Sequence, residues 1–177
     1  MDSIIIYGSQ YGTTKMYAEE LSKRINVKAL SFEKIDDINK YNKIIYLGGL
    51  YAGGVLGMSK TFKKLNDMNN RRIILVTVGL ADPKNTENIN NIRNAIKRQL
   101  SKNILEKIKI FHLRGGIDYS KLNFVHKTLM NLLYKKAKNL PEEKKTVEDK
   151  AIIETYGKKV SFIDFSDLDG IVSEFSK

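Results

Sequence analysis

The chain contains no cysteine and no tryptophan, and only 2 of its 177 residues are proline. Without cysteine there can be no disulfide framework, no thiolate zinc site, no protein-ligated iron–sulfur cluster and no cysteine nucleophile. Any redox chemistry must therefore be carried by a bound cofactor. With 12 glycines and 42% hydrophobic residues, the composition also excludes collagen-like and disordered chains, which lack the apolar surface that offsets ordering entropy.

The chain also lacks a long apolar run. No window approaches the roughly 20 apolar residues of a membrane-spanning helix. The start, Met1-Asp2-Ser3-Ile4-Ile5-Ile6, has an acid where a signal peptide has basic residues. We therefore expect one cytoplasmic domain over residues 1–177, a length that supports a single core.

Acidic residues are fewer than basic ones, with 20 Asp and Glu against 31 Lys and Arg, which gives a net charge of +11. A basic protein can bind nucleic acid through phosphate contacts. However, only 6 of the basic residues are Arg, the side chain that base edges and bidentate phosphate recognition favour. The charge therefore does not lead us to expect a nucleic-acid partner.

Short runs rich in Ile, Val and Tyr alternate with longer segments of helical spacing, which is typical of β-α-β units. The pattern predicts strands over residues 3–7, 27–32, 43–47, 72–78 and 107–113, and helices over 14–24, 60–66 and 86–103. A last helix is predicted from Ser166, because Asp169 stands at capping-box spacing. The first, third and fourth strands are almost continuously apolar, as central strands are. The sequence predicts an α/β fold, a doubly wound five-stranded parallel sheet with helices on both faces.

Residues 115–165 form an insertion after the fifth strand. Within it, residues 121–138 predict an amphipathic basic helix with five Lys and no acid, ended by Pro141; its apolar stripe is Leu122, Val125, Leu129, Leu132 and Leu133. Residues 151–156 and 158–165 are expected to form a small hairpin or extended flap around Gly157.

Three interpretations of this basic helix are open. Its apolar stripe could pack on the sheet edge with the lysines in water. The helix could instead dock on an anionic membrane surface, where each nearby Lys contributes about 1 kcal/mol. In the third interpretation it is a lid or a docking site for an acidic partner.

The segment Ser9-Gln10-Tyr11-Gly12-Thr13-Thr14 follows the first strand and enters the first helix. Unpaired N–H groups and a partial positive charge make a helix N-terminus suitable for a phosphate. An ordinary helix cap needs only one hydroxyl. The spacing matches neither the G-x-x-x-x-G-K-[ST] loop nor the G-x-G-x-x-G fingerprint.

This segment resembles the phosphate loop of the flavodoxin family, [ST]-x-[ST]-G-x-T, with Tyr11 at the third position in place of Ser or Thr. The resemblance implies a flavodoxin-like fold that binds FMN. In such a fold the loop would hold the FMN phosphate through Ser9, Gly12, Thr13 and Thr14, with the amides of Gln10 and Tyr11.

Two further loops follow the third and fourth strands, and in a doubly wound sheet they converge with the first at the carboxyl edge. The resemblance implies that they flank the isoalloxazine ring. The residues concerned are Gly49, Leu50, Tyr51, Ala52, Gly53, Thr77, Val78, Gly79, Leu80 and Asp82. Tyr51 would stack on one face of the ring, and the later loop offers Leu80.

The long insertion and basic surface resemble the branch of the family that includes menaquinone-dependent protoporphyrinogen dehydrogenase. The resemblance implies either an electron-transfer protein working with a redox partner protein or a quinone, or an FMN-dependent oxidoreductase acting with quinone. It also allows peripheral contact with the inner face of a membrane through the basic helix. No catalytic side chain or metal is predicted, and His112 and His126 are expected to be structural.

Overall fold

The computed structural model describes residues 2–51 and 53–177. Its central sheet has the parallel order β2-β1-β3-β5-β6, so the predicted doubly wound α/β fold is confirmed, including the central strands. A short strand, β4, pairs antiparallel with the end of β3. The strands are β1 (Ser3–Gly8), β2 (Ala29–Ser31), β3 (Lys43–Tyr51), β4 (Gly54–Val55), β5 (Arg72–Gly79) and β6 (Ile108–Arg114).

The isoleucine runs explain why the sheet is buried on both faces. Side chains alternate along a strand, so Ile4 and Ile6 of β1 face one core cluster while Ile5 faces the other. All three are at most 1% exposed. A continuous apolar run is what a strand between two helical layers needs.

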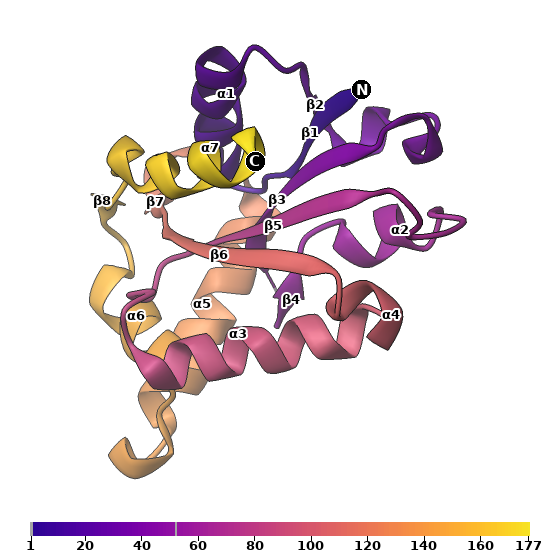
Figure 1. Cartoon of the computed structure of the whole chain (residues 1–177). Helices are drawn as coiled ribbons and strands as arrows, with labels where there is room; N and C mark the ends of the chain where they lie inside the picture. The colour runs from indigo at the N-terminus through magenta and orange to yellow at the C-terminus, as the bar shows by residue number, and fades with distance from the viewer. Residues whose placement is uncertain (1, 52) are drawn as a thin grey trace.

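Helices form a layer on each face of this sheet (Figure 1). The first layer is α1 (Thr13–Ile25) and α7 (Asp169–Ser176), whose Tyr17, Leu21 and Ile171 pack with Ile5. The second layer comprises α2 (Met58–Phe62), α3 (Thr86–Gln99) and α4 (Lys102–Leu105). Short 3-10 turns lie at Phe32–Lys34, Ile38–Lys40 and Phe165–Leu168.

Several predicted boundaries differ from the structure. Strand β2 has three residues rather than six, and α2 begins and ends before the predicted 60–66. The helix predicted over 86–103 ends at Gln99, because Leu100 is extended before α4 begins. The cap predicted at Ser166 is wrong: Asp164 accepts the Ser166 N–H, a 3-10 turn follows, and α7 begins at Asp169.

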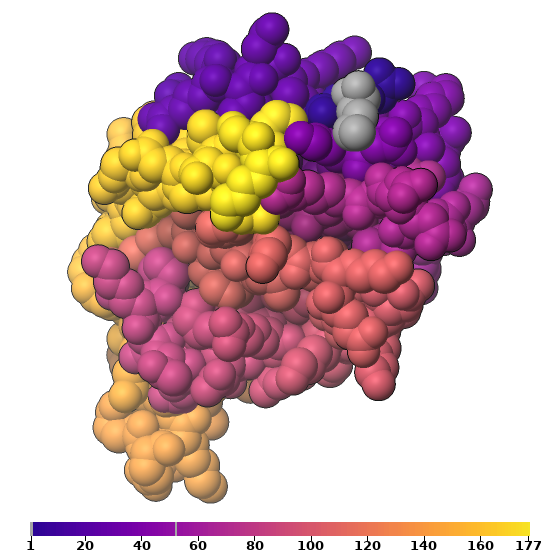
Figure 2. Space-filling model, viewed as in Figure 1, coloured from indigo at the N-terminus to yellow at the C-terminus, as the bar shows by residue number. Residues whose placement is uncertain are grey.

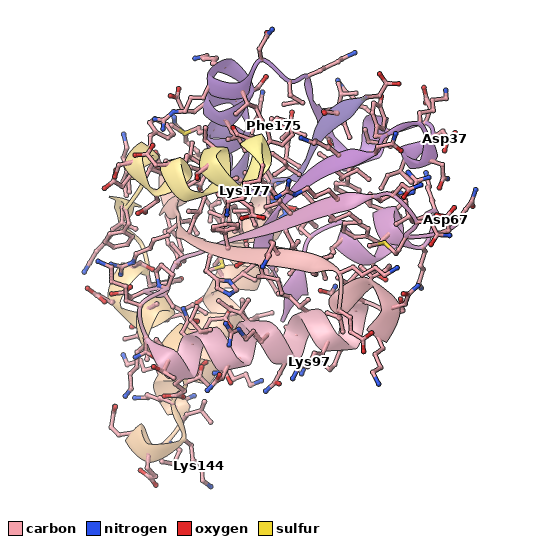
Figure 3. The ribbon with its side chains drawn as sticks, viewed as in Figure 1. Asp37, Asp67, Lys97, Lys144, Phe175 and Lys177 are labelled. Atoms are coloured by element: carbon pink, nitrogen blue, oxygen red, sulfur yellow. The ribbon has the colours of Figure 1, made fainter. Side chains whose placement is uncertain are left out.

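The insertion folds into a small subdomain with its own apolar cluster. It contains β7 (Gly116–Asp118), a 3-10 turn (Tyr119–Lys121), α5 (Phe124–Asn139), a second 3-10 turn (Glu142–Lys144), α6 (Val147–Thr155) and β8 (Lys159–Ser161). The predicted basic helix is α5, capped by Asn123, whose side chain accepts the His126 N–H. The end of the insertion farthest from the sheet projects beyond the body of the molecule, with Lys144 at its tip (Figures 2 and 3).

The hairpin or flap predicted around Gly157 is wrong. Residues 151–155 belong to α6, because Thr146 and Asp149 form a capping box that starts a helix just before them. Strand β8 pairs antiparallel with β7, more than forty residues earlier in the chain. The two strands therefore close the base of the insertion. None of the described helices is long and apolar enough to cross a membrane.

We expect Tyr46→Phe to lower the free energy of unfolding by about 1–2 kcal/mol, because it leaves a partly buried carbonyl without its donor. The Tyr46 side chain is fully buried, and its hydroxyl donates to the Leu56 carbonyl oxygen at 2.6 Å. Urea unfolding would measure the change. Tyr41→Phe is the control and should change stability less; equal effects would contradict the role of the Leu56 bond.

Candidate functional site

The loop after β1 presents backbone N–H groups at the start of α1. Gly12 caps the helix with φ of 91°, a conformation that other residues adopt only under strain. Nothing lies within 4 Å of the position that a Gly12 Cβ would take. The first N–H groups of a helix have no acceptor within that helix. This open helix start can therefore bind an anion.

The hydroxyl groups of this loop have different surroundings. Ser9 Oγ accepts the Lys15 N–H at 3.2 Å. Thr13 Oγ1 donates to the Gly116 carbonyl oxygen at 2.9 Å, which joins the loop to the insertion. Thr14 is 3% exposed, and its Oγ1 lies 3.0 Å from the position of a Cβ on Gly49. Thr14 therefore faces the end of β3, where the next predicted loop begins.

Two cavities meet beside this loop. The smaller, of about 60 Å³, lies between the loop after β1, the ends of β3 and β5, and the pair Gly115 and Gly116. The larger, of about 360 Å³, lies between α3, α5, α6 and the β3–β4 turn. Both are lined by Tyr11, Leu50, Tyr51 and Leu80. Sites for cofactors usually have volumes of about 300–1,000 Å³, so the larger cavity can take a fused ring system next to the anion site.

Most of the predicted site residues converge here. Of the fifteen that the structure describes, eleven line one or both cavities: Gln10, Tyr11, Thr13, Thr14, Gly49, Leu50, Tyr51, Gly53, Val78, Gly79 and Leu80. Ser9, Gly12, Thr77 and Asp82 are not among the lining residues. Ala52 lies outside the described residues.

Thr77 and Asp82 have hydrogen-bond partners outside the two cavities. Thr77 is buried, and its Oγ1 is hydrogen-bonded to His112 Nδ1 of β6 at 2.7 Å. Asp82 accepts the Lys84 N–H at 2.8 Å. Both side chains therefore fix the shape of the strand end and its loop.

His112 makes the stability of the sheet depend on pH. Burial, with a smaller contribution from Arg93, lowers its pKa from 6.5 to about 4. Between these values the unfolded chain binds more protons than the folded one, so the free energy of unfolding falls as pH falls from 6.5 towards 4, by up to about 1.4 kcal/mol per pH unit. Urea unfolding at pH 7 and pH 5 should show that the free energy of unfolding falls less in His112→Gln than in the wild type. An equal fall in both proteins would contradict this assignment.

A cluster of three rings, from Tyr11, Tyr51 and His126, joins the insertion to the loop after β1. His126 lies edge-on to Tyr11 at 5.8 Å and to Tyr51 at 6.4 Å between ring centroids. Its Nε2 is also hydrogen-bonded to Gln10 Nε2 at 2.8 Å. Sequence reasoning missed His126 because 116 residues separate it from Gln10.

Tyr11 explains the departure from the family pattern at the third position of the loop. Its ring packs against the apolar cluster of the insertion, which includes Ile117, Met130 and Ile152. Its hydroxyl is buried, without a hydrogen-bond partner among the described residues, and burial raises its pKa to about 12. A small hydroxyl residue could not make this apolar contact. Tyr11 was thus the one signal in the sequence that this loop has an additional neighbour.

The insertion also supplies a wall of the larger cavity. Leu129, Met130 and Leu133 of α5 and Ile152 of α6 belong to its apolar lining. Helix α3 contributes the polar residues Asn88, Asn91, Asn94 and Arg98 together with the apolar Ile92 and Ala95, and α6 also contributes Glu148. A largely apolar lining with several hydrogen-bonding side chains suits a flat ring with polar edges. Together with the anion site, this donor set fits FMN.

Comparison with family models supports the resemblance to the flavodoxin family. A family model described as "Flavodoxin domain" matches residues 4–144. The chain is similar to the FMN-bound flavodoxin of Fusobacterium nucleatum (16% identity, TM-score 0.45, 63% of this chain and 69% of the other). It is also similar to an FMN-bound flavoprotein of Lactobacillus acidophilus (14% identity, TM-score 0.42, 64% and 92%). A flavoprotein of Bacteroides uniformis shares 12% identity, with a TM-score of 0.45 and coverage of 64% and 90%. No curated protein matches the chain.

Proposed function

The chain belongs to the flavodoxin domain family, and we propose that it transfers electrons through noncovalently bound FMN. The family match supports FMN as the cofactor. The observation that carries the proposal is the open helix start at Gly12, followed by the smaller cavity that Thr13 and Thr14 line and by the larger cavity of about 360 Å³. Tyr51 and Leu80 line both cavities. One end binds a phosphate and the other has room for the ring.

Bound FMN would supply reversible electron transfer, while the protein would supply position and surroundings. The N–H groups at the start of α1 would hold the phosphate. Tyr51 and Leu80 would hold the ring between the loops after β3 and β5. Leu129 and Leu133 would exclude water from the side that the insertion covers. The net charge of +11 would favour the approach of acidic partners.

A titration of the purified chain with FMN tests this proposal. We expect one FMN to bind per chain, seen as a shifted flavin absorbance spectrum and quenched flavin fluorescence. Riboflavin, which lacks the phosphate, should bind at least tenfold more weakly, because the helix start would lose its ligand. Failure to bind FMN would refute the proposal, and equal affinity for both flavins would refute the anion site.

The proposed partners are a redox protein or a quinone. In this proposal the ring occupies the part of the larger cavity beside Tyr51 and Leu80, and a small molecule would reach it from the part that α5 and α6 line. A lipid-soluble quinone resides in a membrane, so this route would need the chain to reach a membrane surface, which is one of the three interpretations of the basic helix.

A second candidate function is an FMN-dependent oxidoreductase of the protoporphyrinogen dehydrogenase type. The part of the larger cavity that α5 and α6 line favours it, because a simple electron carrier needs no further space beside its flavin. In this reaction the porphyrinogen would lose electron pairs and protons to the flavin, and a quinone would take them up. Anaerobic mixing with protoporphyrinogen would test it: bleaching of the flavin absorbance supports the enzyme, and unchanged absorbance refutes it.

The contact between Gln10 and His126 should slow the loss of FMN. A hydrogen bond of about 1 kcal/mol that keeps the insertion on the loop corresponds to roughly a fivefold change. We expect His126→Ala and Gln10→Ala each to speed FMN dissociation by about that factor, and the double variant to add little. Stopped-flow flavin fluorescence would measure the rates.

The exposed neighbour Lys127 provides the matched control for this comparison. Lys127→Ala should leave the dissociation rate unchanged. Fully additive effects in the Gln10/His126 double variant would show that the two side chains act separately.

A further inference from the structure

Helix α5 has two faces of different character. The inner face carries Met130 and Ala137, both buried, and His126 beside the phosphate loop. On the opposite side Phe124 is 84% exposed, Val125 69% and Leu132 60%. Residues seven or eight positions apart lie on one side of an α-helix, so these three form one outer face. Val125 and Leu132, two residues of the predicted apolar stripe, are therefore not packed on the sheet edge.

Large exposed apolar side chains are concentrated on this helix. Among the described residues, the only other large hydrophobic side chain of this kind is Met16, which is 48% exposed on α1. Single exposed apolar residues are common, but a contiguous group marks an interaction site. The outer face of α5 is thus an unpartnered apolar surface.

Lysines surround and extend this surface. Lys135 and Lys136 lie on the outer face beyond Leu132, and the exposed Lys121, Lys127 and Lys138 flank it. No Asp or Glu occurs from residue 121 to residue 141. The face therefore pairs apolar anchors at its N-terminal half with positive charge at its C-terminal half and sides.

We infer that the outer face of α5 docks on an anionic lipid bilayer. Lipid phosphates would neutralise the lysines, while Phe124, Val125 and Leu132 would enter the layer between headgroups and acyl chains. A second copy of the chain is a poor occupant, because it would bring lysines against lysines. This inference rests on the proposed function for its purpose: the inner face of the same helix reaches the candidate flavin site, so docking would bring that site to the membrane surface.

A single tryptophan can report the contact directly, because the chain has none of its own. We expect Phe124→Trp fluorescence to shift to the blue on addition of vesicles made from equal parts phosphatidylglycerol and phosphatidylcholine, and to stay unchanged with phosphatidylcholine alone. Met16→Trp is the control and should not shift with either vesicle. A shift only at residue 16, or none at either residue, would refute the docking face.

Sedimentation of the full chain with the same vesicles separates the contribution of the apolar side chains from that of the lysines. Phe124→Ser with Leu132→Ser, and separately Lys135→Ala with Lys136→Ala, should each reduce the bound fraction at least fivefold. Lys63→Ala with Lys64→Ala removes the same charge from exposed positions elsewhere and should have a smaller effect. Unchanged binding in both α5 variants would refute the proposal, as would a dimer abolished by Phe124→Ser with Leu132→Ser. FMN titration of each variant shows independently whether the flavin site is intact.

Discussion

Replacement of Gly12 by valine is expected to weaken FMN binding about a hundredfold, a loss near 2.7 kcal/mol. Gly12 has φ of 91° at the cap of α1, and a β-branched residue there is strained by about 1–3 kcal/mol. The surrounding space is open, so the cost arises from the backbone. Relaxing that strain would turn the N–H groups of the first turn away from the phosphate.

Thr14→Val tests the other half of the same site, because valine keeps the shape of threonine without its hydroxyl. The residue is buried against the end of β3, and we expect about tenfold weaker FMN binding. Circular dichroism should show that both variants retain the fold. Isothermal titration against FMN would measure the affinities.

The combined Gly12 and Thr14 variant should lose far more affinity than either His112→Ala or His126→Ala. His112 belongs to the β5–β6 contact, and His126 contributes one hydrogen bond from the insertion. If the loop variants and the histidine variants had equal affinity for FMN, the phosphate site would lie elsewhere.

The sheet was predictable because local pattern and tertiary environment agree there. The runs Ile4-Ile5-Ile6 and Ile73-Ile74-Leu75-Val76 have strand propensity, and their burial between two helical layers selects the same structure. Convergence of the three loops then followed from the topology rule for parallel sheets.

The insertion was less predictable because distant pairings decide its structure. Residues 151–155 contain Ile and Thr, which occur readily in strands, but the capping box at Thr146 and contacts with α5 make the segment helical. Strand β8, near the end of the insertion, pairs with β7 at its beginning. No local period encodes that pairing.

In the candidate site, too, local sequence predicts part of the structure and distant contacts decide the rest. Gln10 and Tyr11 lie in the loop between β1 and α1, as the sequence predicts. Their contact with His126 depends on how the insertion folds back. A histidine on a helix carries no signal of its own. Only the unusual residue at position 11 indicated that the loop packs against something further.

Tyr11→Ser separates the two roles of that position, since it restores the family pattern while it removes the ring that packs on the insertion. We expect the insertion to lose about 2–3 kcal/mol of local stability, because a large, mostly buried ring leaves its cluster. Hydrogen exchange in α5 and α6 should accelerate by about thirtyfold or more, while exchange in β1 and β3 stays slow.

FMN binding distinguishes this variant from a general loss of packing. Tyr156→Ser is the matched control, because the Tyr156 ring stacks on Tyr134 within the insertion, with 4.0 Å between ring centroids. Loss of this ring should also speed hydrogen exchange in α5 and α6, while the Tyr11 ring stays on the loop. Tyr11→Ser should therefore speed FMN dissociation more than Tyr156→Ser does. If Tyr11→Ser instead tightened FMN binding and left α5 protected, the serine hydroxyl would be a phosphate ligand, and contacts such as Gln10–His126 and Thr13–Gly116 would suffice to hold the insertion on the loop.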